Sequence, residues 1–155
     1  MAIPFAGWIA ERRGLWRLAI VACLICPSAR ADGACRYVPL DPGTGRVTID
    51  GRTIDLGEAD SLPVPGAWQG PIAIAGVTRC VVDPAVAIVE RPIFQDGRHM
   101  LVTTYSGSNR TIFAIELTTC RVVWRSAAFA GAVRLTGDTL FLGKTARPLG
   151  PNCLP

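Results

Sequence analysis

The stretch RHMLVTTYSGSNRTIFAIELTTCRVVWRSAAFAGAVRLTGDTLFLG, residues 98–143, carries the main strand pattern of this chain. It contains several short runs that are rich in Val, Ile, Thr, Phe and Trp, and each run stops at a cluster of Gly, Ser, Asn, Asp or Thr. β-Branched and aromatic residues favour strands, and the intervening clusters favour tight turns. We therefore expect an antiparallel meander here, and we expect it to form the body of the hydrophobic core.

A second β-rich region lies closer to the N-terminus. Asp50-Gly51 is the strongest short hairpin signal in the sequence, because these residue types accept the positive φ angles of a tight hairpin turn. It separates residues 46–49 from residues 52–56, and both segments carry β-branched residues. The pattern predicts a two-stranded ribbon.

The segment between this ribbon and the meander is punctuated by Pro and Gly. Residues 57–70 are interpreted as a loop, in which Trp68 either is exposed for binding or folds back over the edge of the core. Short apolar strands are expected at residues 72–76, 80–82 and 85–91. We interpret Pro92 as the end of the last of these strands, because proline lacks the N–H that a strand ladder needs.

No stretch after residue 31 keeps a period of 3.6 residues, so we expect little helix. The sequence thus predicts an all-β fold, an antiparallel meander that forms a sandwich or a partly open barrel of about eight to ten strands. Residues 32–155 are expected to form one such domain, which is long enough to bury roughly two thirds of its extended-chain surface.

The first 31 residues have the features of an export signal. The basic side chains that precede its apolar run are Arg12, Arg13 and Arg17. The run has nine residues, 18–26, far fewer than the roughly 20 that span a bilayer, and a small-x-small pattern ends at Ala31. We therefore expect a bacterial signal peptide over residues 1–31 and a mature chain in the periplasm or outside the cell. Lipidation of Cys23, in a short lipobox-like sequence, is the minor alternative.

Removal of this leader changes the charge balance. The chain has 16 basic and 12 acidic residues, and the leader holds four of the basic ones and one acidic one, so 12 and 11 remain. Binding to nucleic acid needs clustered Lys and Arg that neutralise phosphates. Here Lys144 is the only lysine, and the arginines are scattered singly. We therefore expect no nucleic-acid partner.

Four cysteines remain in the mature chain, namely Cys35, Cys80, Cys120 and Cys153. An even number in a small exported chain predicts two disulfides, each of which contributes about 2–4 kcal/mol to stability. The spacings contain no C-x-x-C pair, and His99 is the only histidine, so we expect no metal site. Four cysteines allow three pairings. The pairing that we slightly prefer joins Cys35 to Cys80 and Cys120 to Cys153.

The sequence also contains an internal similarity. A shift of 40 residues lays residues 71–82 over residues 111–122 and aligns Cys80 with Cys120. A period of this length is that of a propeller blade, although β-rich segments also share Ile, Val and Thr through composition alone. A true repeat and a coincidence both stay open.

Residues 111–125, TIFAIELTTCRVVWR, resemble the strand-turn-strand part of the quinoprotein-type (PQQ-type) β-propeller repeat. That repeat runs as aromatic-Ala-Leu-Asp, a Thr-Gly-Lys turn and Val-Leu-Trp. The matching positions are Phe113, Ala114, Ile115, Thr119, Val122, Val123 and Trp124, whereas Glu116 replaces the usual Asp and Cys120 the usual turn Gly. The match covers part of one blade, and the chain is too short for a closed ring, so the resemblance implies no cofactor site. At Trp124 it implies packing against a neighbouring sheet or against a partner.

Catalytic residues in a recognisable arrangement are missing from the sequence. A Ser-His-acid or Cys-His nucleophile needs a histidine as base, and we interpret His99 as a surface or strand-end residue. Ser106-Gly107-Ser108 is explained by a turn and lacks the G-x-S-x-G pattern of a nucleophile elbow. We therefore expect no enzymatic activity and no cofactor, with an unfamiliar enzyme centred on His99 as the alternative.

These properties favour a binding function. We expect an envelope module that recognises another exported protein, in particular as an inhibitor or immunity partner of a secreted or cell-wall-directed enzyme. The alternative is an accessory, propeller-like module that docks on a periplasmic quinoprotein dehydrogenase. The candidate contact residues are Tyr105, Asn109, Arg110, Trp124 and Arg125, because exposed aromatic and Arg side chains often anchor interfaces. Each of them also fits an ordinary turn or strand position.

Overall fold

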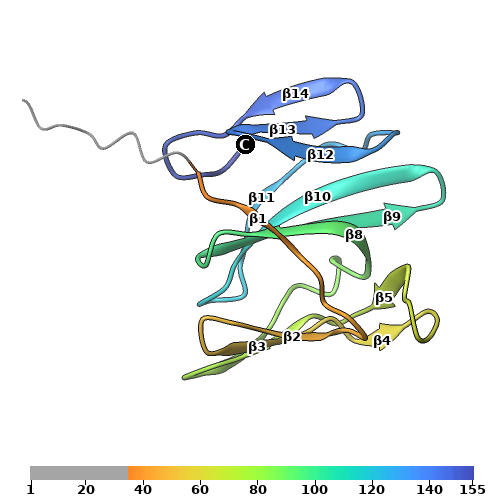
Figure 1. Cartoon of the computed structure of the whole chain (residues 1–155), viewed down its shortest axis with the longest axis vertical. Coiled ribbons are helices and arrows are strands. Elements are labelled where there is room, and N and C mark those ends of the chain that lie inside the picture. The colour runs from red at the N-terminus through yellow and green to blue at the C-terminus, as the bar shows by residue number, and fades with distance from the viewer. Residues whose placement is uncertain (1–34) are drawn as a thin grey trace, which may run out of the picture. The chain divides into compact units, whose positions relative to one another are not determined.

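The computed structural model describes residues 35–155, and the expected leader with Cys23 lies outside these residues. The described part contains fourteen strands and no helix, and thus no helix long and apolar enough to cross a membrane. The strands form three antiparallel sheets that are not closed into a barrel (Figure 1). The expected antiparallel all-β fold is confirmed, with more and shorter strands than expected.

The largest sheet, which we call the central sheet, has seven strands in the order β11-β10-β9-β8-β5-β4, and β1 pairs with β8 beside this path. Its strands are β1 (Val38–Leu40), β4 (Glu58–Ala59), β5 (Ala67–Gln69), β8 (Ile88–Gln95), β9 (His99–Ser106), β10 (Asn109–Glu116) and β11 (Val122–Arg125). Strands β8 to β11 are neighbours both in sequence and in space. This confirms the antiparallel meander that the sequence predicts.

Two smaller sheets complete the domain. The N-terminal sheet has the order β2-β3-β6-β7, and its strands are β2 (Arg46–Ile49), β3 (Arg52–Asp55), β6 (Ala73–Ala75) and β7 (Arg79–Val81). The C-terminal sheet has the order β12-β13-β14, and its strands are β12 (Val133–Thr136), β13 (Thr139–Leu142) and β14 (Thr145–Pro148). The central strands β8 to β11 lie between these two sheets (Figure 1).

Each face of the central sheet carries its own hydrophobic cluster. Successive side chains of a strand point to opposite faces, so Phe113 and Ile115 of β10 join the cluster with the N-terminal sheet, and Ile112 and Ala114 join the cluster with the C-terminal sheet. All four side chains are buried. A strand buried on both faces has a continuous apolar run instead of an alternating pattern. This explains why the predicted meander forms the body of the core.

The expected ribbon is the hairpin of β2 and β3, in which Ile49 pairs with Arg52. Asp50 and Gly51 form its turn with φ angles of 46° and 75°. Positive φ at both central residues is the property of a type I′ turn, whose twist matches that of the flanking strands. The sequence signal and the local geometry agree here.

Two expectations for the segment before the meander are wrong. Residues 57–70 are not simply a loop, because they supply β4 and β5 to the central sheet. Trp68 lies in β5 and is completely buried, with the guanidinium of Arg91 4.8 Å from its ring centroid, so it packs in the core. Pro92 does not end a strand either. It lies inside β8, where the register with β9 shifts between Glu90 and Ile93, and such a bulge accommodates a residue without an N–H.

The expected disulfides form, but the preferred pairing is wrong. Cys35 is bonded to Cys153 and Cys80 to Cys120, across 118 and 40 residues of sequence. The first bond joins the two ends of the domain, where the hydroxyl of Tyr37 also donates to the carbonyl oxygen of Cys153 at 3.0 Å. The second joins β7 to the turn after β10. Spacing along the chain did not predict these pairs, because the layering of the sheets brings distant segments together.

Candidate functional site

Strand β11 lies at one end of the central sheet. It pairs with β10 on one side, and no strand of the described part pairs with it on the other. The chain continues along β10 beyond β11, because the Ser126 N–H donates to the Ile112 carbonyl at 2.9 Å, and Phe129 exchanges backbone hydrogen bonds of 2.8 and 2.9 Å with Arg110. We call residues 122–129 the β11 edge.

The backbone of the β11 edge has an orientation that follows from its register. Ala114 pairs with Trp124, and the register then shifts so that Ile115 pairs with Val122. Peptide groups of a strand alternate between its two sides. The register is constant from Trp124 to Ser126, so the N–H of Trp124 faces β10 as that of Ser126 does. The N–H and C=O groups of Arg125 and the C=O of Val123 then face away. On that outer side, Val123 and Arg125 make no backbone hydrogen bond to another described residue.

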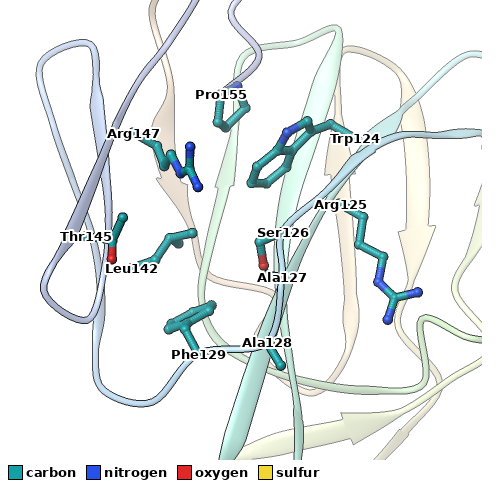
Figure 2. A pocket seen from close by; sticks show the side chains of 10 residues that line it. All are labelled: Trp124, Arg125, Ser126, Ala127, Ala128, Phe129, Leu142, Thr145, Arg147 and Pro155. Carbon is teal, nitrogen blue, oxygen red and sulfur yellow. The ribbon is translucent and has the colours of Figure 1, made fainter.

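A hollow of about 260 Å³ lies between the β11 edge and the β13–β14 hairpin, and we call it the first hollow. Its walls are Trp124, Arg125, Ser126, Ala127, Ala128, Phe129, Leu142, Thr145, Arg147 and Pro155. Figure 2 shows Trp124, Phe129, Leu142 and Arg147 around the opening, whereas Arg125 points away from it. Three large apolar side chains and one guanidinium thus share this space.

A second hollow, of about 480 Å³, lies on the opposite face of the central sheet. Phe113, in the wall of the second hollow, belongs to the hydrophobic cluster with the N-terminal sheet. Trp124, in the wall of the first hollow, packs on the cluster with the C-terminal sheet, so the two hollows lie on opposite faces of the central sheet. The walls of this second hollow are Ala85, Ala87, Ile88, Thr104, Tyr105, Ser106, Asn109, Thr111, Phe113, Arg125 and Ala128. Arg125 and Ala128 line both hollows. The β11 edge therefore has a hollow on each side.

The guanidinium of Arg125 lies over the ring of Phe113, 5.5 Å from the ring centroid. An aromatic face attracts a cation and restricts where its side chain points. Arg125 and Arg147 are both exposed, and neither takes part in the ion pairs found within residues 35–155. Arg125 within the β11 edge and Arg147 beside it thus carry positive charges that form no ion pair in this part of the chain.

Four of the five predicted contact residues gather at these hollows. Tyr105, Asn109 and Arg125 line the second hollow, and Trp124 with Arg125 lines the first. Arg110 lies close by but has another role. Its guanidinium binds both carboxylate oxygens of Glu90, whose side chain is only 15% exposed. Arg110 is thus held by an ion pair within the fold, and its side chain is 35% exposed.

Sequence reasoning missed the residues that complete the first hollow. Phe129 follows β11 in the chain, whereas Leu142 and Arg147 come from the C-terminal sheet, far from Trp124 in sequence. Each appears in the sequence as an ordinary apolar or charged strand residue. The packing of the C-terminal sheet on the central sheet brings Leu142 and Arg147 to the β11 edge, and no local pattern signals that contact.

His99 was expected at the surface or at a strand end. It is the first residue of β9, but it is buried, with 3% of its surface exposed, and its Nδ1 lies 3.3 Å from Oδ2 of Asp96. Burial, together with the negative charge of Asp96, raises the pKa of the nearby Tyr37. Within residues 35–155, His99 makes no hydrogen bond to a Ser or Cys side chain, and no group of three His, Cys, Asp or Glu residues is arranged to hold a metal.

Comparison of the sequence with models of protein families and with curated proteins finds no match. The functional assignment rests on the geometry of the β11 edge.

Proposed function

We propose that this chain is an exported module that binds another protein through the β11 edge. The observation that carries the proposal is the pair of hollows on the two faces of the sheet at β11, a strand whose outer side has no partner strand in the described chain, with Arg125 in the wall of both. Aromatic and Arg side chains beside concave surfaces are the residues that most often dominate the energy of protein interfaces. Trp124, Phe129 and Tyr105 supply the aromatic part here.

Export is supported by the two disulfides and by the leader-like sequence of residues 1–31. Disulfides persist in the periplasm and outside the cell, where the surroundings are oxidising. The partner is then another protein of that compartment.

The specific form of the proposal is an inhibitor or immunity partner of a secreted or cell-wall-directed enzyme. Its support is that the surface is built on strands of a sheet that is disulfide-bonded to its neighbour through Cys80 and Cys120. A surface that is already ordered loses little conformational entropy on binding, and this favours tight complexes. Such a surface suits a domain whose task is to block another protein.

The alternative is an accessory module of a periplasmic quinoprotein dehydrogenase. Two observations favour it. Strands β8 to β11 form a four-stranded antiparallel meander next to the four-stranded N-terminal sheet, and propeller blades are four-stranded sheets of this kind. Trp124 packs on the cluster shared with the C-terminal sheet, which is the kind of contact that the resemblance implies for it.

Affinity capture tests the proposal. The oxidised chain is immobilised and exposed to periplasmic and secreted protein, beside a reduced and unfolded sample and an Arg125→Glu/Arg147→Glu variant. Retention of one wall-directed or secreted enzyme by the native chain, with inhibition of that enzyme, is the expected result. Retention of a quinoprotein dehydrogenase supports the alternative. If the native chain retains nothing beyond the unfolded sample, the binding proposal is wrong.

A further inference from the structure

We propose that the β11 edge binds its partner by strand addition, and that the added segment is an extended, acidic stretch of the partner chain. This inference rests on the proposed function, since it names the binding mode and the chemistry of the segment that this edge accepts. Three independent properties of the edge lead to it: the direction of its backbone groups, the position of the two hollows, and the charge around them.

The outward backbone groups of the β11 edge are suited to pair with another strand. The N–H and C=O groups of Arg125 and the C=O of Val123 point away from β10, and no strand of the described chain pairs with them. Such an edge is a template for another extended chain, whose main-chain hydrogen bonds supply affinity. Val123 is 40% exposed, so the edge is open to a partner.

The two hollows fit the geometry of an added strand. Successive side chains of a strand point to opposite faces of its sheet. A segment that extends the central sheet at β11 therefore directs one side chain towards the first hollow and the next towards the second. The first hollow presents Trp124, Phe129 and Leu142, which suit an aliphatic or aromatic side chain. Pockets for alternate side chains are what gives strand addition its specificity.

Charge selects an acidic segment. Arg147 stands in the wall of the first hollow and Arg125 in the walls of both. Neither is paired with a carboxylate in the described part of the chain. A planar guanidinium binds a carboxylate through two parallel hydrogen bonds. The stacking of the Arg125 guanidinium on Phe113 restricts its orientation before a partner binds. The same charges repel a second copy of this edge, so they disfavour self-association while they favour an acidic partner.

A displayed library of random peptides about ten residues long tests the inference. The full chain, purified in its oxidised form after export, is the target. We expect the selected peptides to be enriched in Asp and Glu and to alternate these with apolar residues. The backbone nitrogens of a bound strand form two alternating sets, and one set faces β11. Methylation of that set in a selected peptide is expected to weaken binding about tenfold or more, because it removes the main-chain donors to β11.

Variants of the chain provide the second arm. Arg125→Glu and Arg147→Glu are each expected to weaken binding of a selected peptide about fivefold or more at low salt. Arg134→Glu is the matched control. Like Arg125, Arg134 is exposed, belongs to none of the ion pairs of residues 35–155, and has its guanidinium over an aromatic ring, 5.4 Å from the centroid of Phe141. Unlike Arg125, it lines neither hollow. It is expected to change binding less than about twofold. Circular dichroism and thermal unfolding of all three variants establish that each is folded.

Several results would overturn the inference. These are a library that yields no specific binder, binders without acidic enrichment, binding that tolerates methylation of both sets of alternate backbone nitrogens when each set is methylated in turn, and an Arg134→Glu effect as large as that of Arg125→Glu. The outcome is separable from that of the proposed function. If the chain captures and inhibits an exported enzyme but no acidic peptide competes, strand addition is wrong and protein binding stands.

Discussion

Cys80 of β7 is disulfide-bonded to Cys120 in the turn between β10 and β11, with their Cα atoms 5.9 Å apart. The bond connects the N-terminal sheet to the sheet that carries the β11 edge. It also lies on the face of the central sheet where Cys120 joins the larger hydrophobic cluster. The position of the β11 edge thus depends on a covalent link between two layers.

Removal of this bond in a Cys80→Ala/Cys120→Ala variant is expected to lower the free energy of unfolding by about 2–4 kcal/mol, because it restores entropy to the unfolded chain. Urea unfolding of the variant and the native chain measures the difference. Mass spectrometry of unreduced peptides checks the pairing, and the finding of a Cys35–Cys80 peptide would contradict the fold described above.

The ion pair of Arg110 and Glu90 supports a second prediction. Arg110→Met leaves the Glu90 carboxylate, only 15% exposed, without its guanidinium, and we expect a loss of about 1–3 kcal/mol in the free energy of unfolding. The matched control is Arg46→Met. The Arg46–Asp55 pair is much more exposed, at 72% and 36%, so its loss is expected to cost less than about 1 kcal/mol. Equal effects of the two variants would argue against a structural role for Arg110.

The packing of Trp68 supports a third prediction. Gly45 has a φ of 119°, and a Cβ atom there would lie 2.9 Å from Cδ1 of the buried Trp68. Gly45→Ala therefore meets both backbone strain and a steric clash. Gly43→Ala is the control, because Gly43 has a φ of 54° and open space around it. Left-handed backbone alone costs about 1–2 kcal/mol, and thermal unfolding should show a clearly larger loss for Gly45→Ala. A smaller loss for Gly45→Ala would mean that Trp68 is not packed as described.

Several of these features have a clear basis in the sequence. Asp50-Gly51 predicted its hairpin because turn chemistry is local, and the meander followed from β-branched runs separated by turn residues. The bulge at Pro92, the burial of Trp68 and the disulfide pairing depend on which layers pack together. Local patterns do not contain that information. For the same reason the sequence pointed to Trp124 and Arg125 but missed Arg147, which reaches the site from another sheet.

A fourth prediction concerns pH. The hydrogen bond from the Arg46 guanidinium, 2.6 Å from Oδ2 of Asp55, and a second from the Gly57 N–H hold the pKa of Asp55 below its usual value of 3.8. A carboxyl group with a lowered pKa in the folded chain stabilises the fold above its unfolded pKa, and this contribution is lost as the pH falls through the folded value. We expect Asp55→Asn to flatten the acid side of the stability curve. The measurement is the urea midpoint at several pH values below about 5, and curves that run parallel for variant and native chain would contradict the role of Asp55.

Binding at the β11 edge is tested most directly by amide hydrogen exchange, resolved residue by residue by NMR, with and without the captured protein or a selected peptide. In the free chain the amide of Arg125 is expected to exchange fast, because it faces away from β10, whereas that of Ser126, bonded to Ile112, exchanges slowly. Binding is expected to protect Arg125. Protection that appears on another sheet, with the β11 edge unchanged, would contradict the claim that this edge is the binding site.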